Sequence, residues 1–508
     1  MKTLIQWTLF IAVVALGGYR AMAYTSLEQH PAGEYDEQMW TGASTAAYYM
    51  FFKGYHRTAV VPERSFINYA EKYNIAIDKM PPEELQWFDD ALWTFGWKAP
   101  NAGKFIMGFS VVNFSDGMPD PEGSFYRCSS DASKNKWPGN YSDPQLVRQA
   151  RIPNALLSTL TIALTAAIGW AFLHYAVGLI AGAYLAGNIF FIQVNSSAGL
   201  DSPSIFFTTL SVMMIIVVTR QFFRTPSLWK QLFNAAACGL CIGLAIGSKL
   251  NAGVLVYMLA LSLALTSGCI ILQAMARQQS GGTHEQKEKE ERHFSLTNRL
   301  CRLLVSAAAA GLLIMGTFIW LNPQVKTSPL LKIKIIREAV DDFFTWRAGV
   351  KTREEIIKAQ GKPEWDWRKV KSSWPEAFKL VLQRNFYVSN AHANYYGTFG
   401  HLAKLKGNIL DGFFSFLGML YLAALALTEL FKKKRAGASA VLLMSFIVVL
   451  CGNTSFIWID WTRYHMPIYP LYALMIGSGI YGMAMCLRRC LGPGFHFRNS
   501  GPSPPPFC

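Results

Sequence analysis

Apolar stretches of membrane-spanning length recur along this chain, and they restrict its fold more than any other feature. Each is about 17–22 residues long, the length that an α-helix needs to cross a bilayer. The 508 residues are 52% hydrophobic and only 16% charged, whereas a soluble protein usually carries about 25% charged residues. A soluble core of this length would also tend to split into domains. The sequence therefore predicts an all-α polytopic membrane protein.

We expect about ten transmembrane helices and two long extracytoplasmic loops that bear interfacial helices. The expected spans are Leu4–Met22, Pro153–His174, Ala176–Val194, Ser204–Arg220, Leu232–Gly247, Ala252–Ala274, Leu303–Leu321, Ile409–Leu430, Ala438–Gly452 and Met466–Leu487.

The formal charge of +16 lies in short basic clusters between the spans, such as Lys432–Arg435 and Arg488-Arg489. With the N-terminus in the cytoplasm and ten alternating spans, these clusters lie inside, as the positive-inside rule requires. Attraction to the lipid bilayer explains them, and no basic face with interleaved aromatic residues indicates nucleic acid. The long connections 23–152 and 322–408 then lie outside.

Four regions follow from this pattern. An N-terminal transmembrane region covers 1–321 and includes the first outer loop, 23–152. The second extracytoplasmic loop covers 322–408, the C-terminal transmembrane helices cover 409–490, and a Pro-rich tail, 491–508, is expected to be disordered.

Two local features of the N-terminal region carry further expectations. Ala21-Met22-Ala23 resembles a signal-peptidase site, but the apolar run before it is long for a signal and Lys2 is its only leading charge. We therefore expect the first span to be retained. In the first outer loop, 81–93 starts with Pro and acids and continues with apolar residues at helical spacing, which predicts an interfacial helix.

Polar residues interrupt the apolar context at four places that the topology puts at the outer face. These are Asp36-Glu37, the segment Trp97–Lys104, the turn Gly199–Pro203 with Asp201-Ser202, and the turn Gly247–Asn251 with Lys249. Each has an ordinary explanation, because Asp favours helix N-caps and Lys extends from apolar surfaces toward water. Two acids and two lysines on one membrane face nevertheless indicate a functional site.

In their order along the chain, these residues resemble the membrane glycosyltransferases of GT-C type that use polyprenyl-phosphate sugars. The protein O-mannosyltransferases have an Asp-Glu motif in the first outer loop, matched by Asp36-Glu37. Their later loop motif is matched at Pro100, Gly103 and Lys104, their Leu-Asp-Ser stretch at Leu200–Ser202, and their Gly…Ser-Lys stretch at Gly243…Ser248-Lys249. Arg463-Tyr464…Pro467 is similar to an element of the bacterial relatives, including the lipid A aminoarabinose transferase.

The resemblance implies a sugar transfer with inversion, from a polyprenyl-phosphate donor to a protein hydroxyl or an envelope lipid or glycan. The resemblance makes 1–321 the catalytic region, with Asp36 as the general base. Glu37 would be its positioning or metal-binding partner at the catalytic site. The implied substrate-binding residues are Lys104, Arg151, Asp201, Ser202, Lys249, Arg463 and Tyr464, with the cations stabilising the departing phosphate. The second loop is too short for the trefoil domain of the eukaryotic enzymes, so we expect a bacterial inner membrane with the active site facing the periplasm.

The residues leave the cofactor unknown. A divalent cation would have Asp36, Glu37 and Asp201 as candidate ligands, but carboxylates without a clear His companion are a weak zinc signal. Cys238 and Cys241 form a C-x-x-C inside an apolar segment without a second ligand pair, so we assign them no metal.

The alternative function is a multi-pass transporter or flippase of a lipid-linked or small polar substrate. Transporters place their polar groups near the bilayer midplane, often on broken helices in repeated halves. This chain has its acids in outer turns and about 130 residues in one outer loop, which favours an interfacial active site.

Overall fold

The structure, a computed structural model, describes residues 2–28, 30, 35–53, 101–116, 144–224, 227–279, 285–322, 407–456 and 466–490. Every regular element in these ranges is a helix, which confirms the predicted all-α class. The elements are α1 (Lys2–Ala23), α2 (Tyr35–Phe52), α5 (Ala102–Phe114), α6 (Pro144–Phe172), α7 (Tyr175–Gly187), α8 (Ile189–Ser196), α9 (Asp201–Gln221), α10 (Leu228–Ser248), the short η5 (Leu250–Gly253), α11 (Val254–Gln279), α12 (Glu285–Leu321), α19 (Gly407–Phe431), α20 (Ala438–Phe456) and α21 (Tyr469–Cys490).

Eight helices in the described ranges are long and apolar enough to cross a membrane. Eight of the ten expected spans therefore have a matching helix. The expected span Ala438–Gly452 corresponds to a shorter apolar helix, part of α20. The candidate spans are Thr3–Ala23, Pro144–Phe172, Asp201–Gln221, Leu228–Ser248, Leu250–Ala276, Leu296–Leu321, Leu410–Phe431 and Met466–Cys490.

The remaining expected span, Ala176–Val194, is a bent pair rather than one straight helix. The axes of α7 and α8 meet at 69°. Asn188 makes the break, because its backbone is extended and its side chain accepts a hydrogen bond from the Phe191 N–H at the start of α8. At the end of α7, the Ala186 carbonyl accepts a 2.7 Å hydrogen bond from Arg20 Nη1 of α1. A cation at this carbonyl end also suits the helix dipole.

Small residues allow several helix pairs to approach closely. A Cβ on Gly418 would collide with the backbone of Met475, and a Cβ on Gly479 would collide with the backbone of Phe414. These glycines set the crossing of α19 and α21. Gly239 of α10 lies in the same way against the backbone of Ala310 in α12. Close backbone contact through small residues is a usual way for helices to associate in lipid.

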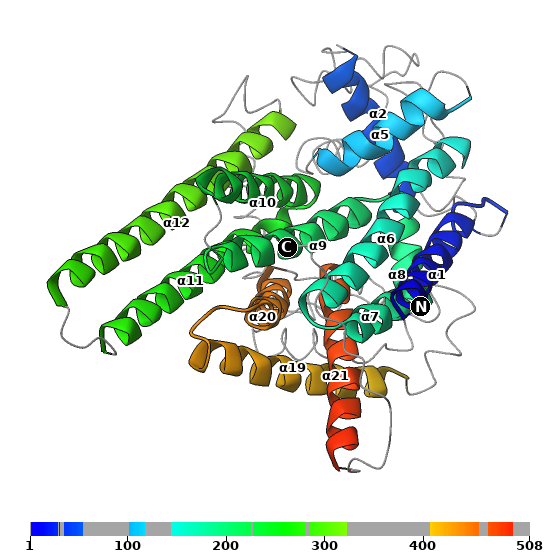
Figure 1. Cartoon of the computed structure of the whole chain (residues 1–508). Coiled ribbons are helices and arrows are strands. Elements are labelled where there is room, and N and C mark those ends of the chain that lie inside the picture. The colour runs from blue at the N-terminus through cyan, green and yellow to red at the C-terminus, as the bar shows by residue number, and fades with distance from the viewer. Residues whose placement is uncertain are drawn as a thin grey trace, which may run out of the picture.

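Two helices of the first long loop, α2 and α5, lie side by side at the top of the view in Figure 1, next to the start of α6. We call this the α2–α5 end of the bundle. Asn101 precedes α5 and donates from Nδ2 to the carbonyl of Leu321, the last residue of α12. Gly103 packs against Leu200 and Pro203 at the start of α9. The α2–α5 end therefore brings together the start of α9 and the end of α12.

Some expectations lie outside the described residues. These are the interfacial helix at 81–93, most of the second loop (323–406) and the tail 491–508. The division of the chain into four regions stays a prediction. The structure instead describes two other helices in the first loop, α2 and α5.

Replacing Arg20 with Ala should lower the free energy of unfolding by about 2 kcal/mol, because a buried carbonyl loses a charged donor. Arg20→Lys should retain part of this energy, since it keeps a cation near the α7 terminus. Thermal unfolding of the purified protein in detergent measures the effect. Arg148→Ala is the matched control, because Arg148 is exposed on α6. Equal losses in Arg20→Ala and Arg148→Ala would contradict the capping role.

Candidate functional site

A buried ion pair joins the first long loop to the membrane helices. Arg151, in the second turn of α6, donates from Nε to Glu37 Oε1 at 2.8 Å and from Nη2 to Glu37 Oε2 at 2.5 Å. The side chains are only 1% and 3% exposed, respectively. Two parallel hydrogen bonds between a guanidinium and a carboxylate fix both distance and orientation. Glu37, in the first turn of α2, therefore holds α2 in a defined position on α6.

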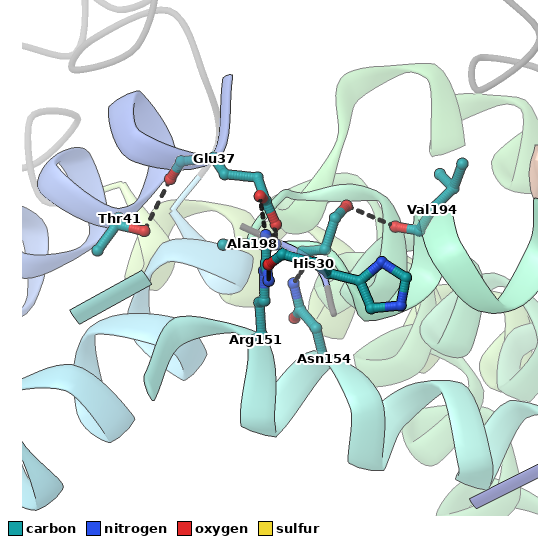
Figure 2. Close-up of polar contacts among 8 residues, drawn as sticks. His30, Glu37, Thr41, Arg151, Asn154, Val194 and Ala198 are labelled. Atoms are coloured by element: carbon teal, nitrogen blue, oxygen red, sulfur yellow. Dashed lines mark hydrogen bonds and ion pairs between the residues drawn. The ribbon is translucent and has the colours of Figure 1, made fainter. Parts of the chain in front are cut away.

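Backbone groups complete this site, as Figure 2 shows. The Ala198 N–H donates to Glu37 Oε1 at 2.9 Å, and Arg151 Nη1 donates to the His30 carbonyl at 2.7 Å. The guanidinium carbon of Arg151 also lies 5.3 Å from the centre of the Tyr24 ring. Both carboxylate oxygens of Glu37 are thus engaged. The side chain serves as a junction between α2, α6 and the α8–α9 turn.

Asn154 fixes the α8–α9 turn from the same face of α6, three residues after Arg151. Its Nδ2 donates to the carbonyls of Ser197 and Gly199 at 2.6 and 2.9 Å. Ser202 Oγ, in the first turn of α9, donates back to the Asn154 carbonyl at 2.9 Å. Sequence reasoning placed Ser202 at the site but missed Asn154. An Asn three residues after a buried Arg in an apolar helix was the available signal.

A second ion pair lies where α9 begins and α10 has just ended. Lys249 Nζ contacts Asp201 Oδ1 at 2.5 Å, and the two side chains are 20% and 14% exposed. Asp201 is the first residue of α9, where the helix dipole favours a negative charge. Lys249 follows α10 with an extended backbone, and its N–H bonds to the Ala245 carbonyl. Unlike the Glu37–Arg151 pair, this pair is partly exposed.

Lys104 lies in the first turn of α5 and is fully buried. Its Nζ donates to Asn101 Oδ1 at 3.3 Å, and Asn101 in turn bonds to the Leu321 carbonyl at the end of α12. The cation therefore lies close to the carbonyl end of a long helix, where positive charge is favoured. In this structure its visible role is to fasten α5 to the bundle.

The structure thus gathers six predicted site residues at the α2–α5 end: Glu37, Lys104, Arg151, Asp201, Ser202 and Lys249. Asp36 is in α2 directly before Glu37, but its side chain lies outside what is described, as do Arg463 and Tyr464. The roles of these residues in catalysis and substrate binding stay predictions.

Within the described ranges, no group of three or more His, Cys, Asp or Glu side chains could hold a metal ion. Glu37, a candidate ligand by sequence, has its oxygens engaged by Arg151 and Ala198. Cys238 and Cys241 are both buried within α10.

Removing one partner of the buried pair should be far more destabilising than removing both. Arg151→Met should cost about 3–5 kcal/mol of unfolding free energy, because it leaves the Glu37 charge buried and unpaired. Glu37→Gln/Arg151→Met should recover most of that loss. Arg148→Met, one turn earlier on α6 and exposed, should have little effect. A double variant no more stable than Arg151→Met would rule out the pairing.

His30 should make the stability of this end depend on pH. Burial lowers its pKa from the usual 6.5, the Arg151 charge lowers it further, and Glu37 partly opposes this. The folded protein thus binds this proton less readily than the unfolded chain. Its stability contribution is present above about pH 6.5 and is lost as the pH falls through the lower folded pKa. Denaturant unfolding from pH 7.5 to 5 should show this loss, and His30→Gln should reduce it; an unchanged profile would contradict the assignment.

Comparison with known proteins supports the resemblance. Residues 134–286 match the family model for dolichyl-phosphate-mannose-protein mannosyltransferase. This range includes Arg151, Asp201 and Lys249. No curated protein has significant sequence similarity to the chain.

Among solved structures, the chain is similar to the apo oligosaccharyltransferase of Archaeoglobus fulgidus, with a TM-score of 0.50 at 11% identity over 97% of this chain and 52% of that one. The chain also matches the archaeal oligosaccharyltransferase AglB from Archaeoglobus fulgidus in complex with an inhibitory peptide and a dolichol-phosphate. That match has a TM-score of 0.46 at 12% identity and the same coverages. The chain thus spans about half the length of these proteins.

At this identity, the likeness to the apo enzyme concerns the fold alone, and it confirms the expected GT-C-type membrane fold. The family match confirms the resemblance predicted from the polar motifs. Residues 134–286 therefore resemble the dolichyl-phosphate-mannose-protein mannosyltransferase family, and the described helices have a GT-C-type fold.

Proposed function

We propose that this protein is a glycosyltransferase that moves a sugar from a polyprenyl-phosphate carrier to an acceptor hydroxyl, with a protein as the first candidate acceptor. The main support is the accessible Asp201–Lys249 pair beside the rigid Glu37–Arg151 junction. Arg151, Asp201 and Lys249 all belong to the segment that matches the mannosyltransferase family. Mannose is accordingly the first sugar to test. The comparisons give no support to the alternative, a transporter or flippase.

The donor needs a cation at its phosphate, because negative charge develops there as the sugar leaves. Lys249 is a partly exposed cation at the α2–α5 end, and its partner Asp201 holds it at the start of α9. We assign Lys249 to the donor phosphate and Asp201 to hydroxyls of the sugar. A preplaced charge of this kind stabilises the transition state without reorganisation during the reaction. Lys104 would contribute to the same positive field from its buried position.

The acceptor needs a base, and we assign this role to Asp36. Glu37 is occupied by Arg151 and the Ala198 N–H, which makes it a positioning residue for its neighbour. The acceptor oxygen attacks the anomeric carbon, the bond from that carbon to the phosphate oxygen breaks, and the proton passes to Asp36. Polyprenyl phosphate leaves with the electron pair. A single displacement of this kind inverts the anomeric carbon.

We place the site on the extracytoplasmic face. Asp201 begins α9 and Lys249 precedes α11 at the α2–α5 end, whereas Arg220 lies at the far end of α9. The Lys432–Arg435 turn bonds through Lys434 to Gln273, near the far end of α11. Basic residues concentrate on the cytoplasmic side of membrane proteins. This distribution supports an active site that faces the periplasm, if the protein belongs to a bacterial inner membrane.

Asp36→Asn should reduce sugar transfer by about 10²–10⁴-fold, the contribution typical of a general base. Lys249→Gln should also reduce the rate at saturating donor, because the phosphate loses its charge in the transition state. The assay follows transfer from a radiolabelled polyprenyl-phosphate mannose to Ser- and Thr-containing peptides in detergent. Asp116→Asn and Arg148→Gln are matched controls, since both side chains are exposed near the site.

Full activity of a folded Asp36→Asn variant would overturn the base assignment. If the wild-type protein carries solutes across sealed liposomes and never transfers a sugar, the proposed class is wrong. Swapping the mannose donor for an aminoarabinose donor, and the peptide for a lipid A-like acceptor, tests the substrates separately from the reaction.

A further inference from the structure

Four consecutive basic residues, Lys432–Arg435, form most of the short turn between α19 and α20. They begin directly after the candidate span Leu410–Phe431. The side chains of Lys432, Lys433 and Arg435 are exposed, and that of Lys434 is partly exposed. The turn therefore places its positive charge directly after a candidate span, where phospholipid headgroups are expected.

The backbone of this turn is hydrogen-bonded to a neighbouring helix. Lys434 has a φ of 47°, a left-handed conformation that residues other than glycine seldom adopt. Its carbonyl accepts a 2.8 Å hydrogen bond from Gln273 Nε2 near the end of α11. Gln273 Oε1 also accepts from Arg299 Nη1 of α12 at 3.5 Å. One glutamine thus ties the basic turn to α11 and to a further arginine.

The acid beside this turn is directed inward. Glu429 Oε2 accepts a 2.6 Å hydrogen bond from Ser439 Oγ, and the carboxylate lies against Gly437. Arg435 Nη2 is 3.8 Å from Glu429 Oε1, so this arginine partly neutralises the acid. Within the described residues, Lys432, Lys433 and Lys434 have no salt-bridge partner. The turn therefore presents three lysines without an acid of its own to balance them.

We propose that the α19–α20 turn is a binding site for the headgroup phosphate of an anionic phospholipid in the adjacent leaflet. Lysine ammonium groups suit a phosphodiester as point charges, and clusters of basic residues beside a span attract anionic lipid. Any basic loop provides such attraction. What distinguishes this turn is its fixed backbone, which lets it bind one lipid without first becoming ordered. The site is separate from the proposed sugar transfer, so either assignment can fail alone.

Lipid binding can be measured by native mass spectrometry of the full-length protein in a neutral detergent. The probes are short-chain phosphatidylglycerol and, as the uncharged comparison, phosphatidylcholine. We expect wild type to bind phosphatidylglycerol in preference. Lys432→Gln/Lys433→Gln/Lys434→Asn should weaken that binding by about 100-fold, from roughly a factor of five for each lysine. Asn is chosen at 434 because it tolerates the left-handed conformation.

Two further variants separate an ordered site from simple charge attraction. Arg488→Gln/Arg489→Gln removes two exposed charges at the end of α21 and should change binding by less than about threefold if the turn is the site. Gln273→Ala removes no charge but releases the Lys434 carbonyl, and it should weaken binding several-fold. If the triple variant does not fold, Lys432→Gln/Lys433→Gln should still weaken binding by about 25-fold.

Wild-type affinity in the folded lysine variants would overturn the proposal, as would an equal loss in the Arg488/Arg489 variant or unchanged binding in Gln273→Ala. Inorganic phosphate and soluble inositol hexakisphosphate serve as competitors. If they displace phosphatidylglycerol as effectively as the lipid itself does, the site recognises free phosphate and the lipid assignment is wrong.

Discussion

The bidentate pair between Glu37 and Arg151 is the interaction on which the α2–α5 end depends. It joins a loop helix, a membrane span and, through the Ala198 N–H, the turn between two further helices. Burying two charges is costly, and the attraction between them repays that cost only when their geometry is good. Here every carboxylate oxygen has a donor and the guanidinium also bonds to a carbonyl. Such a junction is better suited to fixing geometry than to moving protons.

Asp201 and Lys249 have a different environment, although they too form an ion pair. Their side chains retain contact with the surroundings, and each lies at a helix end rather than within a helix. A charged group at such a position can exchange its partner for a ligand at little cost. The α2–α5 end thus combines a closed pair, which fixes the framework, with an open pair next to it. This difference agrees with the proposed function, in which the site binds and releases a charged lipid-linked donor.

The periodicity and length of the apolar segments predicted most helices well, because lipid demands the same property of each span. The bend at Asn188 was not predicted, because the mean hydropathy of a whole span hides the effect of a single polar residue. The types of residue at the site were also predictable, because acids and lysines are conspicuous beside apolar segments. Their pairing was not. Glu37 and Arg151 are 114 positions apart, and Asp201 and Lys249 are 48 apart. Which side chains form ion pairs therefore depends on how the helices pack.

The contact between Arg20 and the Ala186 carbonyl has a consequence for how the protein is made. The two residues are 166 positions apart, so α1 emerges from the ribosome long before the helix that it caps. In lipid, an unsatisfied carbonyl at a helix break is expensive. The bend between α7 and α8 therefore gains this hydrogen bond only once α1 has packed against α7. Formation of the α7–α8 bend, which precedes the α8–α9 turn of the site, is thereby coupled to correct insertion of α1.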